Sequence, residues 1–423
     1  SDPTGKDADN IRQGSTLSED HFEALKFDYQ FANPPYGTEW KVDKEDVERE
    51  AQRGFNGRFG AGLPSISDGQ LLFLQHMLSR MNDPQDKPSY IGVFFNGSPL
   101  FSGAAQSGES EIRRWILEND WLDTIIGLPG QIFYNTGIAT YLWILSNRKP
   151  VDRKDKVMLI DASGDEFWSP MKKNLGDKRR EIREEHQQKI FELFQSREQG
   201  KHVKIFDTTD FMYRRVQVER PLKLNFCNSS ERIERLKEAK AFANLATSKK
   251  KDPEAKAKEE SEGKALQQSI LNALQSIPSD LVKDRDVFEG ILDRSFSSHG
   301  VSIKAPIKKA IFNALGERDE SAEICRNRNG QPEPDSELRD HENIPFKESI
   351  SEYMKREVLP HVPDAWVDES FTDHKDEKVG RVGTEISFTR YFYVYNPPRK
   401  LSEIESDLQK LQSEIMHSLQ SSV

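Results

Sequence analysis

Residues 27–36 of the chain read FDYQFANPPY, and this stretch decides how the surrounding sequence is interpreted. Residues 27–32 have the composition of a strand that runs into a loop. Pro34 and Pro35 follow almost at once, and two consecutive prolines fix φ and donate no backbone hydrogen bond. The stretch therefore predicts a strand that ends in a rigid loop whose carbonyl oxygens are free to accept hydrogen bonds.

On both sides of this stretch, from about residue 11 to 160, short apolar runs alternate with helical patterns. The further predicted strands span residues 90–95, 122–128, 138–146 and 157–161, and the predicted helices span residues 69–81 and 111–119. Such alternation predicts an α/β fold with a doubly wound sheet. Ligands of these sheets bind beyond the carboxyl ends of the strands, which is the kind of position that the Asn33 loop occupies.

The remainder of the chain changes in character. Residues 229–275 are rich in Lys, Glu and Ala, which predicts a charged helical or disordered linker. Residues 276–380 predict a mostly helical region, and residues 381–423 a strand, at 385–395, followed by an amphipathic helix. Apolar residues at three-and-four spacing mark this terminal helix, which we expect either to dock a partner subunit or to close its own domain.

The composition limits what the chain does alone. Lys and Arg number 61 against 71 Asp and Glu, a net charge of −10, whereas proteins that grip DNA unaided present a basic face. We expect a partner to supply much of the grip, although local basic residues occur at Lys172, Lys173, Lys178, Arg179 and Arg180. No run of about eighteen apolar residues occurs, and the two cysteines have no metal-ligand spacing. We therefore expect a cytoplasmic protein with reduced thiols, no metal and no membrane contact.

Asn-Pro-Pro-Tyr at residues 33–36 suits the holding of an exocyclic amine. The Asn33 side-chain oxygen and the Pro34 carbonyl can accept both amine hydrogens, which directs the nitrogen lone pair toward a methyl donor. Tyr36 offers a face for an extruded base, and stacking returns roughly 1–3 kcal/mol against a flipping cost of a few kcal/mol. The alternative is a strand-ending turn, as we read Asn-Pro-Pro-Arg at residues 396–399, which lacks the aromatic residue.

The wider sequence resembles the modification subunits of type I restriction-modification systems. The similar stretches are KFDYQFANPPYG (26–37), RGFNGRFGAGLPSISDG (53–69), FYNTGIATYLWIL (133–145), VERPLKLNF (218–226) and EISFTRYFYVYNPPRK (385–400). The resemblance implies a Rossmann-like methyltransferase sheet, of which residues 1–228 would form the C-terminal part. It also implies methyl transfer from S-adenosylmethionine to adenine N6 in double-stranded DNA. A specificity subunit and a restriction subunit are the implied partners.

The resemblance carries over residue by residue. Residues 33–36 match the base-holding motif of the family, with all four as catalytic residues. Phe133 and Asn135 lie in the segment that matches the loop over the other face of the flipped base. Phe133 is the expected second stacking residue, with a core aromatic residue as the alternative. Gly14 and Ser15 match the turn beside the adenine ring of the cofactor, but Ser15 stands where an acidic residue is frequent.

One family element is not found ahead of the motif. The family places a glycine-rich cofactor loop, Asp-Pro-x-x-Gly-x-Gly, before the Asn-Pro-Pro segment, and residues 1–32 contain none. Gly60-Ala61-Gly62 is a lone Gly-x-Gly on the wrong side of the motif, which is a weak pattern. We therefore expect an incomplete cofactor pocket and no activity of this chain alone.

Two other functions use the same features. One is a non-catalytic assembly or DNA-clamping fragment, which the missing cofactor loop favours. The other is a methyltransferase that acts on glutamine side chains or on ribosomal RNA through the same Asn-Pro-Pro-Tyr motif. The long C-terminal region disfavours the latter, because such enzymes are usually small.

Overall fold

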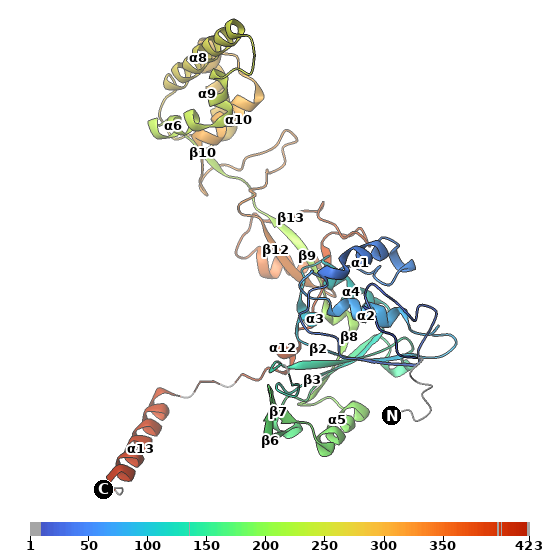
Figure 1. Cartoon of the computed structure of the whole chain (residues 1–423). Coiled ribbons are helices and arrows are strands. Elements are labelled where there is room, and N and C mark those ends of the chain that lie inside the picture. The colour runs from blue at the N-terminus through green and yellow to red at the C-terminus, as the bar shows by residue number, and fades with distance from the viewer. Residues whose placement is uncertain (1–9, 135, 396, 399, 421–423) are drawn as a thin grey trace. The chain divides into compact units, whose positions relative to one another are not determined.

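The computed structural model describes residues 10–134, 136–395, 397–398 and 400–420 (Figure 1). The chain forms two compact units: Ser1–Tyr213 together with Val382–Val423, and Arg214–Arg381. This division differs from the four consecutive segments expected from the sequence, because the C-terminal residues return to the first unit. Each unit is described by itself.

A six-stranded mixed sheet forms the centre of the first unit, in the order β1-β2-β4-β3-β5-β8. Its strands are β1 (Tyr29–Ala32), β2 (Tyr90–Phe95), β3 (Leu122–Leu128), β4 (Thr140–Ser146), β5 (Lys156–Asp161) and β8 (Val203–Asp207). The pairs β1–β2 and β3–β5 are parallel, whereas β4 is antiparallel to both β2 and β3, and β8 to β5. The five predicted strands are confirmed, with ends shifted by two residues at most, and so is the α/β fold class.

Helices lie on both sides of this sheet (Figure 1). One side carries α1 (Lys44–Ala51), α2 (Gln70–Ser79), α3 (Ser98–Phe101) and α4 (Gly108–Glu118). The other side carries α5 (Glu184–Ser196) and the hairpin of β6 (Ser169–Leu175) and β7 (Lys178–Glu181). The predicted helices α2 and α4 are confirmed, and the Ser107 hydroxyl caps α4 by accepting from the Ser110 amide. The sheet is thus enclosed as a layered α/β sandwich.

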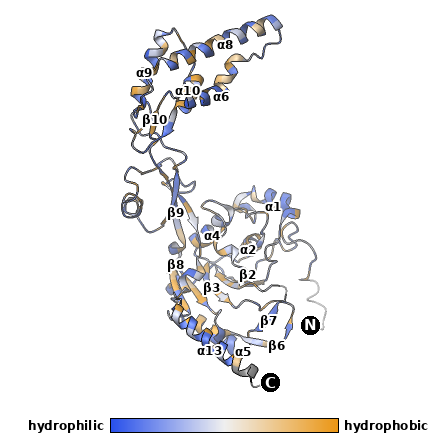
Figure 2. Cartoon of the chain, turned by 90° about the vertical axis from the view of Figure 1, so that its left-hand side faces the viewer, coloured by the Kyte–Doolittle hydropathy of each residue, from blue (hydrophilic) through white to orange (hydrophobic). Residues whose placement is uncertain are grey.

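The α5 side is packed over the middle and far strands of the sheet. Ile126 of β3 and Met158 of β5 are buried there against Ile190, Leu193 and Phe194 of α5. Alternation along each strand places these side chains on one face, because successive strand residues point to opposite faces. The charged helix α1, by contrast, is mostly blue in the hydropathy view (Figure 2).

The edge strand β1 is covered on one face only. The Gln30 side-chain amide donates to the Met77 carbonyl oxygen of α2 at 2.9 Å, so Gln30 faces the α2 side. Tyr29 and Phe31 point to the opposite face, where they are 67% and 83% exposed to solvent. Two large aromatic residues are thus exposed on this face of β1.

The C-terminal residues of the first unit contain β14 (Arg381–Thr384), α12 (Phe388–Phe392) and α13 (Leu401–Gln420). The predicted strand at 385–395 is wrong, because α12 occupies its centre. Helical spacing brings Phe388 against Tyr141 and Tyr391 against Phe206, with ring centroids 5.1 and 4.3 Å apart. The terminal helix is confirmed as α13, and its apolar positions are exposed: Leu401, Ile404, Leu408, Leu411 and Ile415.

The second unit contains a helical core built from α6 (Ser230–Glu238), α7 (Lys240–Ala243), α8 (Pro253–Gln275), α9 (Arg285–Ser298) and α10 (Ala305–Leu315). The sequence predicts a charged linker, either helical or disordered, over residues 229–275. These residues are mostly helical, but they form part of a packed core and not a linker. Ile270 and Leu274 of α8 are fully buried against Leu236, Phe288 and Leu292. Hydrophilic and hydrophobic residues are interspersed along α8 (Figure 2), and this minority of apolar residues suffices to dock it.

Strands dominate the rest of the second unit. They are β9 (Met212–Glu219), β10 (Leu224–Phe226), β11 (Gly316–Arg318), β12 (Asp340–Pro345) and β13 (Trp366–Val367), with a short helix α11 (Ile350–Tyr353). The expectation of a mostly helical region at 276–380 therefore holds for α9 and α10 and fails beyond residue 316. The strands β12 and β13 form because distant β9 supplies their partner: Trp366 pairs with Glu219, and Val367 with Val218, whereas β11 pairs with β10.

Candidate functional site

The Asn-Pro-Pro-Tyr loop begins where β1 ends, at the carboxyl end of the strand. Pro34 is buried and anchors the loop, whereas Asn33 is exposed. Gly37 closes the turn with φ of 58°, a left-handed conformation that glycine adopts without strain. The Tyr36 hydroxyl donates a hydrogen bond to the Asn33 side-chain oxygen at 2.6 Å. The loop thus presents the polar end of Asn33 to solvent in a held orientation.

Tyr36 remains a hydrogen-bond donor over the whole physiological range. Partial burial of its ring raises the pKa of Tyr36 to about 12, because a phenolate would lose hydration. An amide oxygen has two lone pairs, so Asn33 keeps one acceptor position while it holds the Tyr36 hydroxyl. Within the described residues, no hydrogen bond uses the Pro34 carbonyl oxygen. Two acceptors therefore stand ready on adjacent residues.

A second loop brings Phe133 to this site. It leaves β3 through Gly130 and Gln131, and Gln131 has a left-handed φ of 64°. The Phe133 ring lies edge-on to the Tyr36 ring, with centroids 6.3 Å apart and an interplanar angle of 74°. It also meets Phe94 of β2 edge-on at 5.8 Å. The structure therefore brings Tyr36 and Phe133 together. That Phe133 stacks on a base, as the family resemblance implies, stays a prediction, and Asn135 lies outside the described residues.

The space between the two rings is closed in this state. A flat base that stacks on two aromatic faces needs about 3.5 Å on each side, hence ring centroids about 7 Å apart and near parallel. The Tyr36 and Phe133 rings are closer than this and almost perpendicular. A base can enter only if the Phe133 loop moves outward or the ring turns.

An apolar cavity of about 670 Å³ adjoins Phe133 on the α5 side of the sheet. Its lining includes Phe94, Leu128, Ile132, Phe133 and Phe191. The cavity gives the Phe133 ring room to move without loss of apolar contact. Phe133 is partly buried, and its role as a stacking residue stays a prediction.

The turn at Gly14 and Ser15 is exposed. The Ser15 carbonyl oxygen accepts from the Glu19 amide at 2.7 Å, which closes the turn. Among the described residues, no hydrogen bond or ring contact joins Gly14 or Ser15 to the loop at residues 33–36. Their cofactor role stays a prediction.

A buried ionic cluster holds the segment after this turn, and the sequence analysis missed it. The Arg58 guanidinium, 8% exposed, donates to the Thr16 and Leu17 carbonyl oxygens at 2.7 and 2.9 Å and pairs with Glu50 at 2.7 Å. Arg80 pairs with Asp20 in the same way. Arg58 lies 42 residues from Thr16, and Arg80 lies 60 residues from Asp20, so no local sequence pattern reveals these contacts.

His76 of α2 completes the cluster by contacting Arg58 at 3.0 Å through Nδ1. Burial, together with the charge of Arg58, lowers the pKa of His76 to about 4. His76 is thus a neutral, partly buried hydrogen-bond partner of Arg58.

The lowered pKa of His76 predicts a loss of stability in mild acid. The unfolded chain binds this proton near pH 6.5 and the folded chain only near pH 4, so the stabilisation is complete above 6.5 and falls as the pH falls. We expect a loss on the order of 3 kcal/mol between these limits. Urea unfolding of the wild type and His76→Gln at several pH values measures it. Parallel pH profiles of the two proteins would contradict the assignment.

Arg113 and Arg114 of α4 are both buried: Arg113 is 1% and Arg114 4% exposed. Arg113 donates to the carbonyl oxygens of Thr384, Pro99 and Ser102 at 2.7, 3.1 and 2.7 Å. Burial lowers the pKa of Arg113 to about 10. Both residues are structural.

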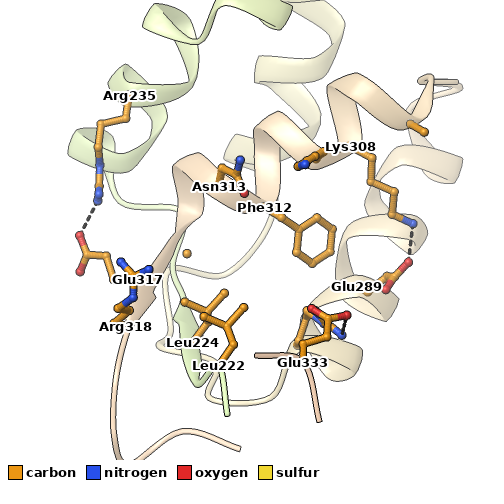
Figure 3. A pocket seen from close by; sticks show the side chains of 14 residues that line it. Leu222, Leu224, Arg235, Glu289, Lys308, Phe312, Asn313, Glu317, Arg318 and Glu333 are labelled. Atoms are coloured by element: carbon orange, nitrogen blue, oxygen red, sulfur yellow. Dashed lines mark hydrogen bonds and ion pairs between the residues drawn. The ribbon is translucent and has the colours of Figure 1, made fainter. Parts of the chain in front are cut away.

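A cleft of about 760 Å³ lies in the second unit, between α10 and the strands β10 and β11 (Figure 3). Leu222, Leu224 and Phe312 form its apolar floor (Figure 3). Three of its cations are paired with carboxylates of the same unit: Arg235–Glu317, Arg285–Glu333 and Lys308–Glu289, at 2.5 to 2.7 Å. Paired cations of this kind offer less charge to an anionic ligand, so the cleft is not our candidate site.

Two general features of the described residues complete the description. None of the helices in them combines the length and the apolar character that crossing a membrane requires. They contain no group of three or more His, Cys, Asp or Glu residues placed to hold a metal ion. Cys227 and Cys325 are free thiols.

A comparison with known families finds a match over the region that contains the six-stranded sheet and the loops of Asn33 and Phe133. The model of the N-6 DNA methylase family matches residues 4–221, which is more than half of the chain. The chain belongs to the N-6 DNA methylase family. The matched region contains the loops of Asn33 and Phe133, and the resemblance to modification subunits found in the sequence is confirmed.

Individual relatives within the N-6 DNA methylase family are similar over the same region. The type I restriction enzyme MjaIX methylase subunit of Methanocaldococcus jannaschii is 28% identical over 194 residues, which are 45% of this chain and 32% of that protein. The HindI methylase subunit of Haemophilus influenzae is 30% identical over 139 residues, 32% of this chain and 28% of that protein. The chain thus spans about a third of the length of the curated relatives that it matches.

A solved structure gives a similar match. The methyltransferase subunit of a type I restriction-modification system from Streptococcus thermophilus is 28% identical, with a TM-score of 0.38. The match covers 47% of this chain and 38% of that chain.

Proposed function

We propose that this chain is the base-holding part of a DNA adenine-N6 methyltransferase, in the modification subunit of a type I restriction-modification system. The juxtaposition of Tyr36 and Phe133 beside the exposed Asn33 carries this proposal, since it lies inside the region matched by the N-6 DNA methylase family. A polar group to hold the amine, next to aromatic rings on which the base can stack, is what a flipped base requires.

In this proposal the loop fixes the amine of a flipped adenine. The Asn33 oxygen and the Pro34 carbonyl accept its two hydrogens, and the nitrogen lone pair is left pointing out of the base plane. The Tyr36 hydroxyl holds Asn33 in place before the base arrives, so little side-chain entropy is lost on binding. The Tyr36 and Phe133 rings then stack on the two faces of the base.

The described residues do not by themselves fit S-adenosylmethionine. Its binding in this family needs a glycine-rich loop, which residues 1–32 lack, and the Gly14 turn shows no contact with the base site. Tyr29 and Phe31, which are exposed, lie on the strand that leads into Asn33. The chain's own contribution is therefore the grip on the base.

If this chain mainly holds the base, it should by itself bind the methyl donor poorly. Isothermal titration calorimetry of S-adenosylmethionine into the wild-type chain is expected to show a dissociation constant of about 1 mM or weaker, because only one side of the pocket is present. Clear micromolar binding would overturn the statement that the pocket is incomplete.

The partners are part of the proposal. We propose that a specificity subunit reads the DNA sequence, and that a restriction subunit can join the assembly. The exposed apolar stripe of α13 is the proposed docking element. The overall test combines the chain, extended to include a cofactor loop, with a specificity subunit, duplex DNA and S-adenosylmethionine. Mass spectrometry should detect N6-methyladenine in the DNA, and its absence would refute the proposed function.

A further inference from the structure

The hairpin of β6 and β7 carries an excess of positive charge in an acidic protein. Residues 169–181 contain five cations, Lys172, Lys173, Lys178, Arg179 and Arg180, against the two acids Asp177 and Glu181. Five minus two leaves a net charge of +3 on this segment, whereas the whole chain carries −10. The charge is therefore local, and the average composition of the chain does not account for it.

The cations of this hairpin have no acidic partners. In the part of the chain that the structure describes, none of the five forms an ion pair, whereas the neighbouring Arg183 pairs with Glu181 at 2.6 Å. Arg235, Arg285 and Lys308 in the cleft of the second unit are also paired within the protein. Unpaired cations repel one another, so a cluster of them favours an anionic ligand from outside.

Backbone hydrogen bonds fasten the hairpin to the loop that carries Phe133. The Asp177 amide donates to the Tyr134 carbonyl oxygen at 3.0 Å, and the Arg179 and Arg180 amides donate to the Gln131 carbonyl oxygen at 3.0 and 3.1 Å. Gly176 allows this approach, because its φ is 61° and a side chain there would meet the Tyr134 carbonyl oxygen at 2.6 Å. The hairpin and the base-site loop are thus one connected element.

Two of the cations lie over aromatic rings, one of them Tyr134, which follows Phe133 in the chain. The Lys178 ammonium lies over the Tyr134 ring at 5.2 Å, and the Arg180 guanidinium lies over the Trp168 ring at 3.8 Å. Such contacts orient a cation without neutralising it. The other three, Lys172, Lys173 and Arg179, are exposed. The hairpin thus combines two held cations with three that are free to reach a ligand.

We propose that the β6–β7 hairpin binds phosphates of the DNA strand next to the flipped base. The inference rests on the proposed function, because a nucleotide that stacks on Phe133 brings its backbone past the adjoining Tyr134 and Lys178. Contacts of this kind position the duplex and carry no sequence information. They also supply, at the base site itself, part of the grip that the acidic chain otherwise lacks.

The salt dependence of DNA binding measures the number of phosphates contacted. The logarithm of the affinity falls with the logarithm of the salt concentration by about 0.9 for each phosphate neutralised. Replacing three contacting cations by glutamine should therefore reduce this slope by about 2 to 3. Exposed side chains of a hairpin make few contacts within the protein, so the fold should be unaffected.

The experiment compares two triple variants of the full chain with the wild type. One is Lys172→Gln/Lys173→Gln/Arg179→Gln, and the control is Lys249→Gln/Lys250→Gln/Lys251→Gln, which removes the same charge from the second unit. Fluorescence anisotropy with a labelled duplex, at several salt concentrations, gives the slope for each protein. We expect a reduced slope and at least about tenfold weaker binding at low salt for the hairpin variant, and wild-type values for the control.

Several results would overturn the inference. These are an unchanged slope in the hairpin variant, an equal loss in both variants, or no binding of duplex by the wild-type chain. A hairpin variant that binds duplex normally but fails to bind the specificity subunit would assign the surface to an acidic protein instead. If hairpin-dependent binding is found but the assembled enzyme methylates no adenine, the inference stands and the proposed function fails.

Discussion

Replacing Asn33 by alanine is expected to lower the rate of methyl transfer in the assembled enzyme by about 10²–10³-fold, the usual cost of losing one polar group that acts on the reacting atoms. The side-chain oxygen of Asn33 is the exposed acceptor beside the two aromatic rings, and alanine leaves one amine hydrogen without a partner. The nitrogen lone pair is then no longer directed. Single-turnover transfer of a labelled methyl group from S-adenosylmethionine to duplex DNA measures the effect.

Tyr36→Phe is the matched control for Asn33→Ala. It removes the 2.6 Å hydrogen bond to Asn33 and keeps the ring that stacks on the base. A single hydrogen bond contributes about 0.5–1.5 kcal/mol, so we expect about a tenfold loss at most. Cofactor binding of the assembled enzyme should be nearly intact in both variants. An equal loss of cofactor binding in Asn33→Ala would contradict the role assigned to Asn33.

Replacing Arg113 by alanine is expected to destabilise the first unit by about 3–5 kcal/mol, because it leaves buried carbonyl oxygens unpaired and opens a cavity. Arg113 is almost fully buried and joins α4 to the loop after β2 and to the returning C-terminal segment through Pro99, Ser102 and Thr384. Urea unfolding followed by tryptophan fluorescence reports on it directly, since Trp115 and Trp121 lie on or next to α4.

Arg49→Ala is the control for Arg113→Ala. Arg49 also lies on a helix and pairs with Asp46, but 71% of its side chain is exposed. Exposed pairs of this kind contribute about 0–1 kcal/mol, so the control should unfold nearly as the wild type does. Equal unfolding midpoints for Arg113→Ala and the wild type would show that the three carbonyl contacts do not stabilise the fold.

The candidate site shows how far a local pattern reaches. The Asn-Pro-Pro-Tyr loop was predictable, because two prolines and the preceding strand constrain the backbone through near neighbours alone. The distance between this loop and Phe133 was not predictable, because about a hundred residues of chain separate the two and only the family resemblance linked them. The geometry adds what no pattern contains: the rings are edge-on and the base space is closed.

The sequence by itself determined five of the six strands of the α/β sheet, all but β8, together with the helices α2 and α4 and the terminal helix α13. Apolar periodicity reports which face of a segment is buried, and that is a property of consecutive residues. Only the tertiary structure decided the roles of Arg113, of residues 385–395 and of the β6–β7 hairpin. Arg113 donates to Thr384 at a separation of 271 residues. The hairpin is held beside the Phe133 loop by hydrogen bonds from its backbone amides to carbonyl oxygens of that loop. A charged side chain looks the same in sequence whether it is buried among carbonyl oxygens or exposed to solvent, because the partners that decide its state come from distant parts of the chain.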